Sequence, residues 1–182
     1  MEVKDQAVQN LNDIKNILDE LKITFWLDGG TCLGAYRDKD FCEGDEDDID
    51  LCCKYDYVNF KDEIINRALK LGFTLFHNWK MEIALIRNGS KIDIFFYKKQ
   101  NNEYFSHLYS GDNIDSWCVV PDKYYDNLEN VKFYGVEFNI PSPIEEYLEF
   151  KYGDWRTKVH RKDYLCYRPE QNRVVRKHYE EI

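Results

Sequence analysis

The sequence lacks the cysteine spacing of a structural zinc site. None of its six cysteines forms a Cys-x-x-Cys pair, the spacing that many zinc-binding modules share. We therefore expect free thiols and a reducing, cytosolic environment.

Long apolar runs are also missing. No stretch approaches the roughly 20 consecutive apolar residues of a transmembrane helix. The polar start Met-Glu-Val-Lys-Asp does not contain the apolar segment of a signal peptide. We expect a cytoplasmic protein without a membrane span.

The chain has no excess of positive charge. It carries 34 acidic and 25 basic residues, for a net charge of −9, which argues against a polyanion-binding surface over the whole protein. Eight of the basic residues lie in the tail between Arg156 and His178, which has few acidic residues. We expect no nucleic-acid partner, and we expect Arg156 and this tail to guide an anionic donor or acceptor.

Two common phosphate or metal motifs are absent. The acidic run 43–50 does not follow the Asp-x-Asp-x-Asp-Gly register of an EF-hand loop, and no glutamate ends it. Residues 160–163 (His-Arg-Lys-Asp) echo a kinase catalytic loop, but a lysine is inserted and the Gly-rich loop and Asp-Phe-Gly are missing. The sequence therefore fits neither an EF-hand calcium-binding protein nor a protein kinase.

Hydrophobic periodicity predicts an α+β fold, with helices flanking a mixed or antiparallel sheet. We expect one domain over residues 1–182, with its core at about 20–100 and a C-terminal helix and basic tail at about 141–182. Thr31 and Ser142 are the expected helix N-caps, and Asn88-Gly89 predicts a hairpin turn. The expected helices are 2–21, 31–37, 56–71 and 143–152, and the expected strands are 23–27, 48–53, 73–77, 81–86, 91–97, 103–109 and 117–120, with a hairpin over 131–140.

Two aspartates on one strand form the first candidate site. Asp48 and Asp50 alternate with apolar residues, so both carboxylates project from the same face. Like charges so placed repel one another unless a cation lies between them, and a hard divalent ion such as Mg²⁺ or Mn²⁺ fits oxygen ligands. Glu46, in the preceding loop, is a further candidate metal ligand.

Asp93 is the expected third carboxylate. It lies inside the strongly apolar strand 91–97, where an unpaired charge would be unfavourable. We expect it to complete the site as a metal ligand or as a general base. Read alone, a strand aspartate is often only a hydrogen-bonded structural residue, and an acidic run is often a solvated loop.

A glycine turn precedes the acidic segment. Gly29-Gly30-Thr31 connects a strand to a helix and would offer backbone N–H groups to a phosphate. Arg37, near the end of that helix, would add a charge-assisted contact. A lone Gly-Gly pair is a common turn, so this prediction depends on the order of the motifs rather than on the turn itself.

Three segments together resemble the LicD family, which includes bacterial phosphorylcholine transferases and, more distantly, fukutin and fukutin-related protein. The segments are 26–37 (Trp-Leu-Asp-Gly-Gly-Thr-Cys-Leu-Gly-Ala-Tyr-Arg), 46–51 (Glu-Asp-Asp-Ile-Asp-Leu) and 141–156 (Pro-Ser-Pro-Ile-Glu-Glu-Tyr-Leu-Glu-Phe-Lys-Tyr-Gly-Asp-Trp-Arg). One departure is Gly44-Asp45, where family members often have Pro-Trp.

The resemblance implies a DNA-polymerase-β-like nucleotidyltransferase fold. It also implies transfer of an alcohol phosphate from a nucleoside diphosphate donor, typically CDP-linked, to a glycan hydroxyl. Asp48 and Asp50 match the metal-binding pair of the family motif, and Glu46 occupies a further acidic position. Gly29, Gly30, Thr31 and Arg37 match the phosphate side of the motif.

Three functions remain open on the sequence. The leading hypothesis is a Mg²⁺-dependent phosphotransferase acting on a CDP-alcohol such as CDP-choline, CDP-ribitol or CDP-glycerol. A nucleotidyltransferase would instead use an NTP and release pyrophosphate. An inactive binding or scaffold subunit would bind neither divalent metal nor nucleotide.

Overall fold

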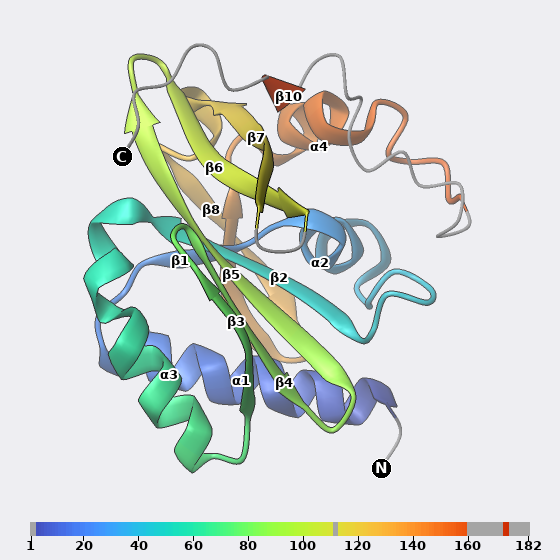
Figure 1. The fold of residues 1–182 in the computed structure, drawn as a ribbon. Helices are drawn as coiled ribbons and strands as arrows, with labels where there is room; N and C mark the ends of the chain where they lie inside the picture. Colours follow the sequence, from blue (N-terminus) through green and yellow to red (C-terminus); the bar gives the residue numbers. More distant parts are fainter. Residues whose placement is uncertain (1–2, 111–112, 160–172, 175–182) are drawn as a thin grey trace.

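The computed structural model describes residues 3–110, 113–159 and 173–174. Two helices, α1 (Val3–Glu20) and α3 (Lys61–Lys70), lie side by side and cover one face of the sheet (Figure 1). Most of their apolar residues are buried there, as the helical periodicity predicts. None of the described helices combines the length and apolar character needed to cross a bilayer.

The main sheet is mixed, which confirms the predicted α+β class. Its central pair, β2 (Asp48–Lys54) and β5 (Ser90–Gln100), is parallel, and the other pairs are antiparallel. The strand order is β1 (Phe25–Leu27), β2, β5, β6 (Glu103–Ser110), β7 (Asn113–Pro121) and β10 (Arg173–Val174), while β4 (Glu82–Arg87) joins β5 to β3 (Thr74–Trp79).

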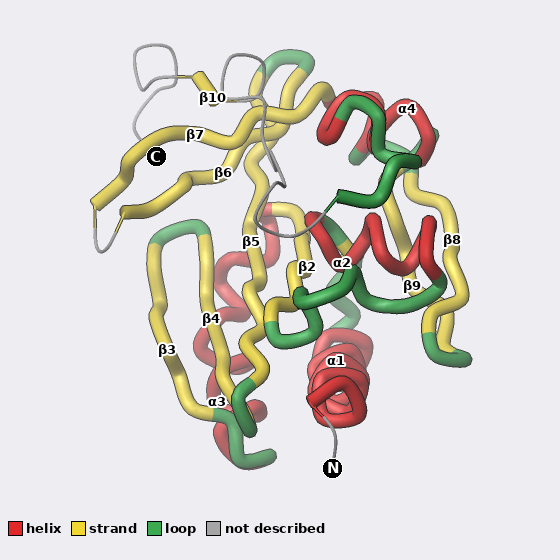
Figure 2. Tube along the Cα trace, turned by 90° about the vertical axis from the view of Figure 1, so that its right-hand side faces the viewer, coloured by secondary structure: helices red, strands yellow, loops and turns green. Residues whose placement is uncertain are grey.

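A separate hairpin and a short helix complete the fold. The hairpin consists of β8 (Leu128–Phe133) and β9 (Val136–Pro141), and α4 (Ile144–Tyr152) follows it. Figure 2 shows α2 (Gly29–Leu33) between β2 and β9, with α4 above it at the end of the molecule opposite α1. The expected turn at Asn88-Gly89 is confirmed, because both residues have positive φ, as a tight hairpin requires.

Three local expectations are wrong. The helix expected over 56–71 is divided into a 3-10 helix, Tyr55–Phe60, and α3, because the Tyr-Asp-Tyr-Val-Asn-Phe stretch consists of weak helix formers. Thr31 is inside α2, whose N-cap is Asp28. Ser142 is not the N-cap of α4, because Pro143 has an extended ψ of 131° and occupies that position itself.

The two faces of β2 differ in character, as the alternation predicts. Ile49 and Leu51 are fully buried beneath the helix layer, whereas Asp48 and Asp50 are only partly buried. The acidic face therefore looks away from α1 and α3, towards the turn between β1 and α2. Most of the basic tail, with Cys166, lies outside the described residues.

Candidate active site

The turn between β1 and α2 contacts the acidic strand directly. Gly29 has a φ of +55°, and a Cβ built on it would lie 1.9 Å from Oδ2 of Asp50. A Cβ on Gly30 would lie 2.0 Å from Oδ2 of Asp45. Both glycines therefore make room for carboxylates, a requirement separate from the predicted approach of a phosphate.

Thr31 connects the turn to β2. Its side chain is buried, and its Oγ1 accepts a hydrogen bond from the backbone N–H of Asp50 at 3.0 Å. The N–H of Asp28 in turn donates to the carbonyl of Asp50 at 3.1 Å. These two bonds hold the backbone of Asp50 from both sides, so its carboxylate has a defined position.

Three predicted carboxylates meet on this face. Asp48 and Asp50 are two residues apart on β2, and Asp93 on β5 is the register partner of Asp50. One oxygen from each of the three side chains lies within 4.8 Å of the other two. The parallel pairing of β2 with β5 thus converts separated sequence positions into one acidic cluster.

A lysine lies within the cluster. Nζ of Lys91 lies 2.7 Å from Oδ2 of Asp93 and 3.1 Å from Oδ1 of Asp48. Burial alone would lower the pKa of Lys91, but these two carboxylates outweigh it and raise the pKa. Lys91 is two residues before Asp93 on the same strand, so period-2 geometry identifies it as a neighbour that the sequence prediction did not include.

The cluster fits a divalent cation. Burial, followed by the charges of Asp48 and Asp93, raises the pKa of Asp50 well above its usual range. Burial raises the pKa of Asp93 to about 6, although Lys91 limits the rise. Oδ1 of Asp93 is buried and has no hydrogen-bond partner among the described residues. Converging oxygens with an excess of negative charge are the ligand set of a hard cation.

A buried ion pair beneath the turn escaped the sequence prediction. Nζ of Lys151, from α4, lies 2.8 Å from Oδ1 of Asp28, and both side chains are at most 5% exposed. Hydroxyl groups of Tyr147 and Tyr125 also donate to this carboxylate. Burial alone would raise the pKa of Asp28, but Lys151 and the hydrogen bond from Tyr147 outweigh it and lower the pKa. A lysine in an amphipathic helix gives no local signal of such burial.

Arg37 is engaged with other parts of the chain. Its guanidinium donates to the carboxylate of Asp38 at 2.8 Å and to the carbonyl of Trp155 at 3.0 Å, and its side chain is 9% exposed. With Glu46 and Lys158 it lines a surface hollow of 360 Å³. Glu46 is therefore beside Arg37 rather than within the three-carboxylate cluster. The donor-binding role of Arg37 and the metal-binding role of Glu46 stay predictions.

Arg156 lies just beyond α4. Its guanidinium donates to Glu145 at 2.6 Å and stacks over the ring of Trp155, 4.2 Å from the centroid. More than half of its side chain is exposed. The structure thus places Arg156 at the surface beside α4, and its role towards an anionic ligand stays a prediction.

Comparison with known families identifies the domain. Residues 22–143 match the model of the LicD/FKTN/FKRP nucleotidyltransferase domain, which is more than half of the chain. The chain belongs to the LicD family. The LicD match ends immediately before α4, so Lys151 lies outside the matched region although its ammonium reaches Asp28 beside the Gly-Gly turn.

Relatives with similar sequences are longer proteins. The mouse protein named ribitol-5-phosphate transferase FKTN is 27% identical over 169 residues, which cover 87% of this chain and 35% of that protein. An uncharacterized protein of Rickettsia typhi is 28% identical over 152 residues, covering 81% of this chain and 45% of that protein. The chain therefore spans less than half the length of either relative.

Solved structures support the fold of this LicD domain. The antibiotic-resistance factor ANT(2'')-Ia has a TM-score of 0.56 at 16% identity, over 88% of this chain and 77% of that chain. A putative nucleotidyltransferase from Thermotoga maritima has a TM-score of 0.50 at 14% identity, over 80% and 83% of the two chains. The predicted nucleotidyltransferase fold is confirmed.

Proposed function

We propose that this LicD domain transfers an alcohol phosphate from a CDP-linked alcohol to a hydroxyl of a glycan. The observation that carries the proposal is the convergence of Asp48, Asp50 and Asp93 beside the Gly29-Gly30 turn in a chain of this family. The name of the FKTN relative, a ribitol-5-phosphate transferase, supports an alcohol phosphate as the transferred group.

Asp48 and Asp50 would hold a Mg²⁺ or Mn²⁺ ion, with Asp93 as a further ligand or as the base that accepts the proton of the attacking hydroxyl. When bound, the cation would neutralise charge on the donor phosphates. The backbone of Asp50 donates a hydrogen bond to Thr31 and accepts one from the N–H of Asp28, and these two bonds would keep its carboxylate in position. Such fixed placement lowers the reorganisation that catalysis requires.

The donor phosphates would lie against the first turn of α2. The first N–H groups of a helix have no partner within it, so Gly30 and Thr31 suit phosphate oxygens. Gly29, Gly30 and Thr31 thus combine two tasks, because they approach the phosphates and also pack against the acidic strand. Arg37 and Arg156 would contribute only if their present contacts with Asp38 and Glu145 were exchanged for the donor.

The test combines Mg²⁺, a panel of CDP-alcohols and a glycan acceptor. We expect release of CMP with CDP-ribitol, CDP-choline or CDP-glycerol, and its loss in Asp50→Asn. Asp62→Asn is the matched control, because Asp62 is exposed on α3 at the opposite face of the sheet. Unchanged CMP release in Asp50→Asn would contradict the metal-site assignment.

Two other results would replace the proposal. Pyrophosphate release from CTP or ATP, without CMP release from a CDP-alcohol, would make the domain a nucleotidyltransferase. A folded protein whose melting temperature responds to neither divalent metal nor nucleotide would be a binding or scaffold subunit.

A further inference from the structure

A row of polar side chains continues from the acidic cluster across the sheet. Asp93 on β5 is paired with Asp50 on one side and with Ala84 of β4 on the other, and Ala84 is paired with His77 of β3. Cross-strand partners project from the same face. The small side chain of Ala84 therefore leaves space between the carboxylate of Asp93 and the imidazole of His77.

A β-bulge places His77 on this face. The register between β3 and β4 shifts between Leu75 and His77, so that His77 is opposite Ala84. Without this register shift, His77 would oppose Ile83 and project towards the helix layer. Phe76 is 64% exposed. Bulges often re-aim a side chain at a functional site, and here the bulge turns an imidazole towards Asp93.

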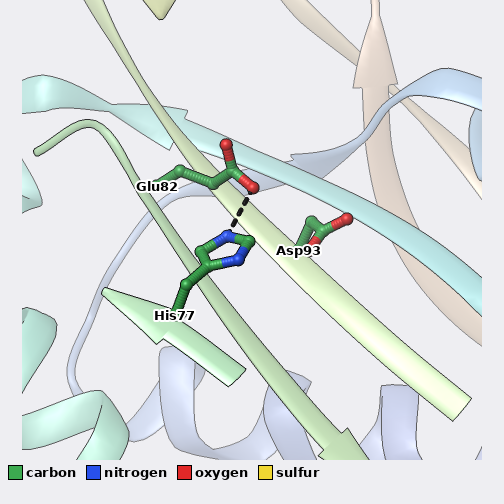
Figure 3. Close-up of side chains that lie close together, drawn as sticks. All are labelled: His77, Glu82 and Asp93. Atoms are coloured by element: carbon green, nitrogen blue, oxygen red, sulfur yellow. Dashed lines mark hydrogen bonds and ion pairs between the residues drawn. The ribbon is translucent and has the colours of Figure 1, made fainter. Parts of the chain in front are cut away.

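Glu82 completes the group. It is two residues from Ala84 on β4 and projects from the same face. Its Oε1 lies 2.7 Å from Nε2 of His77, as Figure 3 shows. One ligand atom each from His77, Glu82 and Asp93 lies within 4.8 Å of the other two.

Glu82 and Asp93 are buried, and His77 is largely buried and held in place. Glu82 is 6% and Asp93 5% exposed, and the side chain of His77 is 11% exposed. The ring of Trp79 stacks on that of His77, with 3.6 Å between centroids and 10° between planes. The stacking fixes the plane of the imidazole, much as outer contacts orient ligands in metal centres.

A carboxylate oxygen in the group is buried without a hydrogen-bond partner in the part of the chain that the structure describes. Lys91 contacts Oδ2 of Asp93, but Oδ1 of Asp93 is buried without a hydrogen-bond partner among the described residues. A buried carboxylate oxygen is normally paired or bound to a metal. Asp93, which carries this oxygen, belongs both to the cluster with Asp48 and Asp50 and to the cluster with His77 and Glu82.

We propose that His77, Glu82 and Asp93 form a second cation site, separate from the Asp48–Asp50 pair and connected to it through the carboxylate of Asp93. One imidazole and two carboxylates suit a divalent ion that accepts a nitrogen ligand beside oxygen ligands, such as Mn²⁺, better than Mg²⁺, which prefers oxygen ligands alone. The proposal concerns metal binding only, so it does not depend on the proposed transfer reaction.

The test is electron paramagnetic resonance of Mn²⁺ added to the whole chain without nucleotide. Pulsed measurements detect coupling between the ion and an imidazole nitrogen. We expect a nitrogen-coupled ion in the unmodified protein, loss of that coupling in His77→Gln, and its retention in Asp50→Asn. Asn78→Gln is the matched control, because Asn78 is adjacent on β3 and exposed on the other face.

Glu82→Gln keeps a hydrogen-bonding group beside His77 but removes a charge, so it tests the site if His77→Gln fails to fold. We expect it to weaken binding of the nitrogen-coupled ion by at least about tenfold. The proposal is overturned if the unmodified protein shows no nitrogen-coupled Mn²⁺, or if folded His77→Gln keeps the coupling. Loss of the coupled ion in folded Asp50→Asn would also overturn it, because the two sites would then be one.

Discussion

At the scale of single residues, Gly29 is constrained in two independent ways. Its φ of +55° is unfavourable for any residue with a Cβ, and the position of that Cβ is taken by the carboxylate of Asp50. Gly44 has a φ of +77° but faces open space. Comparing the two glycines separates backbone strain from the effect on the site.

Gly29→Ala is expected to lower stability by about 1–2 kcal/mol through backbone strain. It should also weaken Mg²⁺ binding by at least about tenfold, as loss of a supporting contact does in metal centres. Urea unfolding and calorimetric titration measure the two effects. Gly44→Ala should lower stability through the same backbone strain and leave Mg²⁺ affinity unchanged. Equal Mg²⁺ affinity in the two variants would show that Asp50 does not need the space left by the missing Cβ of Gly29.

At the scale of elements, the ion pair between Asp28 and Lys151 fastens α4 to the turn before α2. The two residues are far apart in sequence, and both side chains are almost fully buried. Removing one member of a buried pair leaves the other charge without compensation, which is more harmful than removing both.

Lys151→Met is expected to lower the free energy of unfolding by about 3 kcal/mol. Asp28→Asn combined with Lys151→Met should be less destabilised than the sum of the two single changes, because no charge is then left unpaired. Urea unfolding of the four proteins measures the coupling. Strict additivity would mean that Tyr147 and Tyr125, rather than Lys151, satisfy the carboxylate.

A second link between elements depends on pH. The carboxylate of Asp40 accepts hydrogen bonds from Lys4 of α1 and from Tyr134 at the turn between β8 and β9. Burial alone would raise the pKa of Asp40, but Lys4 and Tyr134 outweigh it and lower the pKa. A lowered pKa means that the link stabilises the fold above the unfolded-state pKa of about 3.9 and is lost as pH falls through the folded-state pKa.

Asp40→Asn should therefore be less stable than the unmodified protein at pH 6, and the difference should disappear in more acidic solution. Unfolding by urea across this pH range measures the trend. Tyr134→Phe removes one of the two donors and should show a smaller difference of the same sign. A constant difference at all pH values would exclude the charge of Asp40 as its source.

Sequence periodicity predicts faces but not partners. Alternation placed Asp48 and Asp50 on one face, and the apolar surroundings of Asp93 marked it as exceptional. The parallel register that sets Asp93 opposite Asp50 is a long-range pairing, which local alternation does not encode. His77 shows the same limit, since a bulge reverses the face that simple alternation would assign.

At the scale of the whole molecule, the carboxylates joined by β2 and β5 are expected to link metal binding to global stability. A ligand that binds only the folded state adds about 2.7 kcal/mol at a hundred times its dissociation constant. For a chain of this length, that corresponds to an increase of about 5–10 °C in the melting temperature. Calorimetry with and without Mg²⁺ measures the increase, which Asp50→Asn should abolish and Asp62→Asn should retain.

The ammonium of Lys91 is a counter-ion for the acidic cluster that is covalently part of the chain. Because its ammonium already lies between Asp48 and Asp93, the repulsion between these carboxylates is relieved before any metal arrives. The central strands would therefore pair without metal, and binding of the proposed metal would exchange one cation for another rather than drive folding. On this basis, a chelator should strip the metal and leave a folded chain that can be reloaded.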